Sequence, residues 1–205
     1  MKRIIILMIA SVFFLTDNKA QEIELGVFGG YTFASNIRTY YGEYKIADNP
    51  NFGGHLSFGM APNTFLELSY TRFESTISYY YGPVNQPVGL ITDYIQIGGL
   101  QQTAVGNGNI LPFGAVSLGA SIFTIKDGTT EFNAGSKWMM AATLAGGVKI
   151  HIGDALGIRL QARLGLPMYF NGLYLGTGGA GASLRVPMVQ FDLSAGVFLR
   201  LGGGA

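Results

Sequence analysis

Three side chains in the first third of the sequence have the types and the spacing of a hydrolytic catalytic set. His55 and Ser57 are two residues apart, so they point to the same side of an extended strand. A turn at residues 62–63 places Glu67, on the following strand, roughly opposite Ser57. In acyl hydrolysis a histidine takes the proton of the serine, while a carboxylate orients the imidazole. The alternative interpretation is that a polar sheet face brings such residues together without any catalytic role.

Charged residues form a second group of candidate functional residues. They alternate with apolar residues along extended segments, so they lie on the polar face of the predicted strands. Such charges must pair or be neutralised once they face away from water. Neighbouring strands bring Arg159 or Arg163 within reach of Asp192. We interpret the set as a structural ion-pair network, and the alternative is a gated polar pathway for a small ion or solute. Its members are Glu22, Glu24, Glu67, Lys149, Arg159, Arg163, Asp192 and Arg200.

Strict alternation of apolar and polar residues identifies the elements that carry these side chains. From Leu156 to Leu166 every second residue is apolar, and the residues between are glycine, arginine or glutamine. A period of two is typical of strands with one apolar face. The pattern predicts eight strands, most of them 10 to 16 residues long, a length that suits strands tilted across a bilayer. They cover residues 22–33, 52–61, 64–75, 92–104, 110–124, 137–152, 156–167 and 188–201.

Long and short connections alternate between these strands, which is the layout of an up-and-down antiparallel barrel. Only 12% of the residues are charged, too few for a water-facing exterior, so we expect the apolar faces to point outward into lipid. Barrel closure also puts Arg200 near Glu22 or Glu24. The short turns are 62–63, 105–109 and 153–155, and the long connections are 34–51, 76–91, 125–136 and 168–187.

Aromatic residues gather at the strand ends next to the long connections. Membrane barrels carry girdles of aromatic side chains at the lipid–water interface. We therefore expect these residues to form the girdle on the side of the long connections. They are Tyr31, Phe33, Phe52, Trp138, Tyr169 and Phe170.

Composition excludes several classes of protein. The 205-residue chain is 48% hydrophobic with a formal net charge of +1, which argues against disorder and against a nucleic-acid-binding surface. It has no cysteine, so disulfide frameworks and thiolate zinc sites are excluded. Residues 1–20 combine Lys2 and Arg3 with an apolar run that is too short to span a bilayer. We interpret them as a signal peptide that precedes a barrel at 21–205.

Several predicted strands resemble those of a known group of barrels. The segments are "LELSYTRF" at 66–73, "YIQIGGL" at 94–100, "LPFGAVSLGAS" at 111–121 and "GIRLQARLGL" at 157–166. They resemble successive strands of the outer membrane protein beta-barrel domain family, small porin-like barrels similar to the OmpA and OmpX type. The resemblance implies an all-β, transmembrane, eight-stranded antiparallel β-barrel in the outer membrane of a Gram-negative bacterium. The pair His55 and Ser57 also resembles that of outer-membrane lipid A deacylases, which implies a lipid A-modifying acyl hydrolase as an alternative function.

These features predict an integral outer-membrane barrel with a structural or surface-interaction role and no enzymatic activity. The interior of eight strands is just wide enough for side chains to fill, so we expect a plugged polar lumen. A narrow channel for small ions or solutes is the alternative. No cofactor or metal is predicted, and we expect a monomer that does not bind nucleic acid. The expected partners are outer-membrane lipid and lipopolysaccharide, with an extracellular partner at the connections 34–51, 76–91 and 168–187.

Overall fold

The protein is a barrel built from β-strands. The computed structural model describes residues 22–34, 37–39, 42–80, 87–106, 108–126, 135–176, 179–185 and 189–202. The strands in these ranges join into a single antiparallel sheet. The expected signal peptide at 1–20 lies outside the described residues. Within the described part of the chain, no helix has the length and apolar character needed to cross a membrane.

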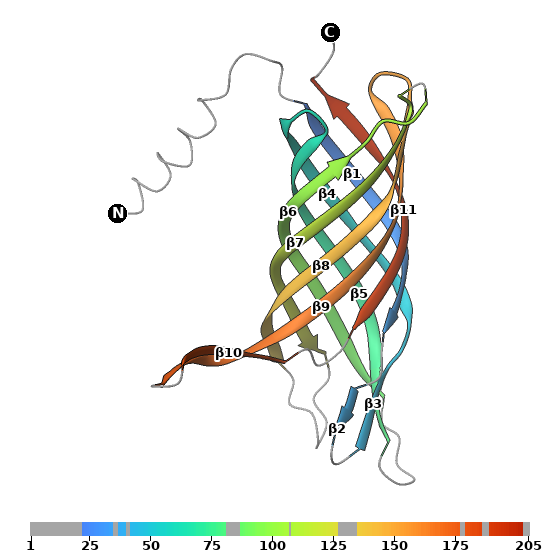
Figure 1. The fold of residues 1–205 in the computed structure, drawn as a ribbon. Helices are drawn as coiled ribbons and strands as arrows, with labels where there is room; N and C mark the ends of the chain where they lie inside the picture. Colours follow the sequence, from blue (N-terminus) through green and yellow to red (C-terminus); the bar gives the residue numbers. More distant parts are fainter. Residues whose placement is uncertain are drawn as a thin grey trace, which may run out of the picture.

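Eight long strands close the barrel, which confirms the predicted fold. Each strand pairs with the next one, and the last pairs with the first, from Ile23 opposite Leu201 to Ala34 opposite Gln190. The strands run obliquely around the barrel axis (Figure 1). In order around the barrel they are β1 (Ile23–Ala34), β4 (Asn49–Ala61), β5 (Thr64–Tyr80), β6 (Val88–Gln102), β7 (Ile110–Ile125), β8 (Gly135–Ile152), β9 (Leu156–Gly176) and β11 (Gln190–Leu201).

Three shorter strands extend the wall at one end of the barrel, which we call the loop rim. β2 (Ile37–Thr39) and β3 (Gly42–Ile46) form a hairpin that pairs with β5, and β10 (Gly179–Arg185) pairs with the far end of β9. Figure 1 shows the hairpin of β9 and β10 leaning away from the barrel. These strands fall within 34–51 and 168–187, which the sequence predicted as connections. The connections therefore carry sheet structure beyond the barrel.

The opposite end, which we call the turn rim, carries the tight turns. Asn63, between β4 and β5, has a φ of 63°, and Gly153, between β8 and β9, has a φ of 75°. Glycine and asparagine adopt this left-handed conformation at low cost. Ile23 and Leu201 pair at the same rim. The barrel therefore begins and ends on the side of the short turns.

Apolar side chains cover the outside of the barrel, and polar side chains face its inside. On β11, Leu193 and Val197 are 48% and 49% exposed, whereas Gln190 and Ser194 are buried. Large apolar residues of a water-soluble protein are normally inside. The distribution is therefore inverted relative to that of a soluble barrel, as the low charge content predicted.

The aromatic residues expected in the girdle can be placed in part. Tyr31, Phe33, Phe52 and Trp138 point outward, and Trp138 is the most exposed of them at 66%. The rings of Tyr31 and Phe33 pack edge to face, with their centroids 5.2 Å apart. The side chains at positions 169 and 170 lie outside the described part of the chain. The described part of the expected girdle is thus on the outer wall.

Pairs of adjacent glycines occur in four of the barrel strands, β1, β4, β6 and β8. In each of four such pairs, one glycine faces inward against a neighbouring strand and the other faces outward. A methyl group added to Gly98 would lie 2.2 Å from the carbonyl oxygen of Val116, whereas one added to Gly99 would meet no atom within 4 Å. The inward glycine therefore lets neighbouring strands approach and bend. The pairs in the described barrel strands are Gly29 and Gly30, Gly53 and Gly54, Gly98 and Gly99, and Gly146 and Gly147.

Candidate functional site in the barrel lumen

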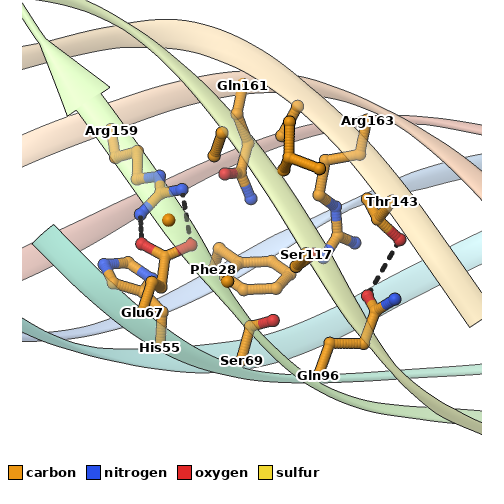
Figure 2. A pocket seen from close by; sticks show the side chains of 15 residues that line it. Phe28, His55, Glu67, Ser69, Gln96, Ser117, Thr143, Arg159, Gln161 and Arg163 are labelled. Carbon is orange, nitrogen blue, oxygen red and sulfur yellow. Dashed lines mark hydrogen bonds and ion pairs between the residues drawn. The ribbon is translucent and has the colours of Figure 1, made fainter.

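An ion pair crosses the middle of the lumen. Glu67 on β5 and Arg159 on β9 lie on opposite sides of the barrel, because equal numbers of strands separate them in both directions. Arg159 donates through both terminal nitrogens to the two carboxylate oxygens of Glu67, at 2.5 and 3.1 Å (Figure 2). Ser57 donates to the same carboxylate at 3.0 Å. The carboxylate of Glu67 thus accepts hydrogen bonds from the opposite strand, β9, and from the adjacent strand, β4.

Lys149 is at the centre of a buried cluster nearer the turn rim. Its side chain has no exposed surface, and its ammonium group forms an ion pair with Glu24. The ammonium also donates to the side-chain oxygen of Gln102 at 3.0 Å. Three phenylalanine rings surround it, and cation–π attraction adds to the ion pair in such an arrangement. The distances from Nζ to the ring centroids are 4.7 Å for Phe65, 5.9 Å for Phe113 and 5.7 Å for Phe198. We call these six residues the Lys149 cluster.

A second ion pair lies toward the loop rim. Arg163 on β9 contacts Asp192 on β11 at 3.1 Å and donates to Thr71, on the opposite strand β5, at 2.5 Å. Thr32 and Asn51 also donate to Asp192, at 2.5 and 3.2 Å. Every one of these residues comes from a different strand of the barrel. The carboxylate of Asp192 therefore has three polar partners, and Arg163 extends this network across the lumen to Thr71.

Two further contacts occupy the loop side of the lumen. The hydroxyl of Tyr94 on β6 donates to Gln190 on β11, and these strands are also on opposite sides of the barrel. Beyond them, Ile46 of β3 packs beside Leu90 in an apolar cluster that the charge pattern did not predict. The signal for it was Val88, Leu90 and Ile91 at the start of β6, where strict alternation of apolar and polar residues fails. The cluster, which we call the Ile46 cluster, contains Ala34, Ile46, Ile77, Leu90, Phe123 and Ile125.

At the turn rim, Arg200 contacts Glu22 at 3.7 Å. It also donates to the backbone carbonyl of Asp154 at 3.1 Å and lies 3.4 Å from a ring nitrogen of His151. Arg200 and Glu22 are both partly exposed. Arg200 and Glu22 therefore lie at the turn-rim end of the lumen and not in its buried part.

The structure places all eight charged residues of the predicted network on the inside of the barrel and joins them one to one. The sequence left open which cation meets Asp192, and the structure assigns Arg163. It also left Glu22 or Glu24 as the partner of Arg200, and the structure assigns Glu22. Sequence reasoning did not foresee the pairing of Arg159 with Glu67 or of Lys149 with Glu24. Neither pair lies on neighbouring strands, and contacts across the lumen depend on the barrel diameter and on side-chain length.

The candidate catalytic residues His55, Ser57 and Glu67 do not assemble as a proton relay. Ser57 and Glu67 are register partners, as predicted, but the hydroxyl of Ser57 donates to the carboxylate. In the described part of the chain, neither ring nitrogen of His55 has a hydrogen-bond partner, and the ring stacks on Phe28. Serine activation needs a hydrogen bond from the serine to the base. Likewise, no group of three or more His, Asp or Glu among the described residues is arranged to hold a metal ion.

Comparison with known proteins gives structural relatives alone. No protein-family model matches the chain, and no curated protein matches it in sequence. Neisserial surface protein A superposes with a TM-score of 0.55 at 12% identity, over 88% of this chain and 97% of that one. The outer membrane protein OprG from Pseudomonas aeruginosa gives 0.57 at 12% identity, over 90% and 97%. The outer membrane protein AlkL, solved in lipid bilayers, gives 0.50 at 9% identity, over 93% and 95%.

These similarities show a shared fold. The chain has the architecture of the small outer membrane barrels, in agreement with the resemblance found in its strands. The similar proteins are a surface protein and outer membrane proteins by name. At such low identity, the lumen side chains described above have to be interpreted on their own chemistry.

Proposed function

We propose that this protein is an integral outer-membrane barrel, inserted as a monomer, whose lumen is plugged by its own side chains and whose role is structural or one of surface interaction. The observation that carries the proposal is the inversion of polarity between the two sides of the wall. Exposed large apolar residues occur on all eight barrel strands, among them Val27, Phe52, Ile97, Val116 and Leu160. An apolar surface that encircles a protein requires lipid around it.

Backbone hydrogen bonding supports the same location. Inside a bilayer each peptide group needs a partner within the protein, which a closed barrel provides. Here the ladder closes between β1 and β11 over the whole length of β1. Export through a signal peptide at residues 1–20 belongs to this proposal, because an outer-membrane barrel must first leave the cytoplasm.

Side-chain bridges across the lumen support the plug. Arg159 to Glu67 and Tyr94 to Gln190 each join opposite strands, so they cross the space that a solute would have to traverse. Nearer the turn rim, Lys149 and the three phenylalanine side chains around it occupy the lumen. Each buried charge here faces an opposite charge, which limits the cost of burying it. Passage of an ion would require several of these contacts to break together.

The surface role is assigned to the loop rim. The hairpin of β2 and β3 and the hairpin of β9 and β10 project there, within the connections 34–51 and 168–187. The connection 76–91 begins on the same rim. Loops held by a rigid scaffold are common sites of recognition. In this proposal an extracellular partner binds there, while lipid and lipopolysaccharide surround the wall.

Two measurements on purified outer-membrane fractions test the proposal. We expect the unboiled protein to migrate faster than the boiled protein in detergent gels, because a closed barrel stays compact until it is heated. In planar bilayers we expect no single-channel steps. A soluble protein without a heat-dependent shift would contradict the membrane location, whereas stepwise conductance of the folded protein would contradict the plug and favour the narrow channel.

A further inference from the structure

The middle of the lumen contains a small chamber beside the pair of Arg159 and Glu67. It forms because β9 contributes long side chains, whereas most of the lining residues on β5 to β8 are small. The centre of a water molecule has about 20 Å³ available there. Figure 2 shows His55, Gln161 and Arg163 around this space. The small residues that leave it open are Ser69, Gly98, Ala115, Ser117 and Ala145.

Residues that line the chamber carry buried polar atoms without hydrogen-bond partners. Neither nitrogen of His55 is hydrogen-bonded within the described residues, and the same holds for the side-chain oxygen of Gln161 and for Nε of Arg163. All three side chains are more than nine-tenths buried, with exposed fractions of 4%, 7% and 8%. A buried polar atom that lacks a partner destabilises the folded protein. Several such atoms around one cavity therefore indicate a bound polar ligand.

The charges around the chamber are already balanced. Arg159 is paired with Glu67, and Arg163 is paired with Asp192. An ion entering the chamber would lose its hydration without meeting an unpaired opposite charge. The atoms that need partners include both a donor, on Arg163, and an acceptor, on Gln161. A neutral molecule that both donates and accepts hydrogen bonds satisfies this requirement.

We propose that the chamber is a water-binding site, in which one or two water molecules bridge His55, Gln161 and Arg163. A buried water needs roughly 10–15 Å³ of such volume and two to four polar partners. The chamber meets both conditions. The inference goes beyond the proposed function, because it holds for the interior of the barrel whether or not the lumen conducts.

Water-edited solid-state NMR of the protein in bilayers tests this site. In such spectra, magnetisation passes from water to nearby protein groups, and lipid-facing groups receive it slowly. We expect fast transfer to the side chains of His55 and Gln161, although both are buried. The outward-facing Leu144 supplies the slow reference. Transfer to His55 and Gln161 at the slow rate of Leu144 would overturn the proposal.

A matched pair of variants on β8 shows whether the transferring water is in the chamber. Ala145→Val puts two methyl groups into the chamber, so we expect transfer to Gln161 to fall to the rate of Leu144. Ala142→Val adds the same groups on the outward-facing side of the strand and should leave transfer unchanged. Equal effects of the two variants would overturn the proposal. Ala115→Val fills the chamber from β7, and it replaces Ala145→Val if that variant loses its heat-dependent gel shift.

Discussion

Arg159 and Glu67 join opposite walls of the barrel through two parallel hydrogen bonds of 2.5 and 3.1 Å. The exposed fractions of their side chains are 2% and 11%, so water screens the pair little. A bidentate contact between a guanidinium and a carboxylate fixes both partners in direction as well as distance. The pair therefore sets the separation of β5 and β9 at the middle of the lumen.

Removing one member of this pair should strongly destabilise the barrel. Arg159→Met leaves the carboxylate of Glu67 buried without its cation, which typically costs about 3–5 kcal/mol. We expect Glu67→Gln combined with Arg159→Met to recover part of the loss, because no buried charge then remains. The measurement is the free energy of unfolding by urea in lipid vesicles.

An exposed ion pair on the same barrel gives the control. Lys126 and Glu74 are 2.7 Å apart with nearly half of each side chain exposed. Solvent screens surface pairs, and they contribute little to stability, so Lys126→Met should change the unfolding free energy little. Equal losses for Arg159→Met and Lys126→Met would show that the pair in the lumen has no special importance.

The two glycines at positions 98 and 99 should respond in opposite ways to the same substitution. Gly98→Ala forces a methyl group against the backbone of β7, and overpacking of this kind costs about 1–3 kcal/mol. Gly99→Ala adds a methyl group in open space, and removing a flexible glycine from a strand is worth roughly 0.5–1 kcal/mol. Urea unfolding compares the two. Destabilisation of similar size in both would contradict the inward and outward assignment.

The sequence predicted the fold well because alternation depends on neighbouring residues along one strand. Leu156 to Leu166 shows an unbroken period of two, and β9 begins at Leu156. The side of the wall that each residue faces follows from this period alone. The added strands β2, β3 and β10 were not predicted, since their pairing partners are the extended ends of β5 and β9.

The sequence predicted which charged residues face the lumen, but it predicted less well which of them contact one another. The sequence indicated that Glu67 and Arg159 both face inward, and it brought Ser57 opposite Glu67 across one turn. Neighbouring strands can be paired from the order of the chain. Contacts between opposite strands depend on the barrel diameter and on side-chain length, so the link of Arg159 to Glu67 and that of Tyr94 to Gln190 emerged from the structure alone.

The single tryptophan should report the position of the membrane surface. Trp138 lies four residues into β8 on the outer wall and is 66% exposed. Tryptophan favours the lipid–water interface. We expect its fluorescence to be quenched more by lipids brominated near the headgroup than by lipids brominated near the chain end. Efficient quenching by aqueous iodide, with none by brominated lipid, would contradict the membrane location.

A tryptophan placed at another position on β8 provides the comparison of membrane depth. Leu144 faces outward further along β8 and is 49% exposed. In a Trp138→Phe background, Leu144→Trp should be quenched more by bromine near the chain end. A depth order that is the reverse of this one would contradict the direction in which β8 crosses the bilayer.

The Lys149 cluster should bind a small organic cation once its lysine is shortened. Lys149→Ala removes the ammonium from its place between three phenylalanine rings and leaves Glu24 buried without a cation, so we expect a loss of about 3–5 kcal/mol in the free energy of unfolding. Propylammonium has the size and charge of the missing group, and aromatic cages attract such cations. Millimolar propylammonium should therefore restore much of the stability, whereas propanol, which lacks the charge, should not. Lys126→Ala, at an exposed site, should respond to neither compound. Equal recovery with propanol would mean that the rings and Glu24 stabilise Lys149 by packing alone.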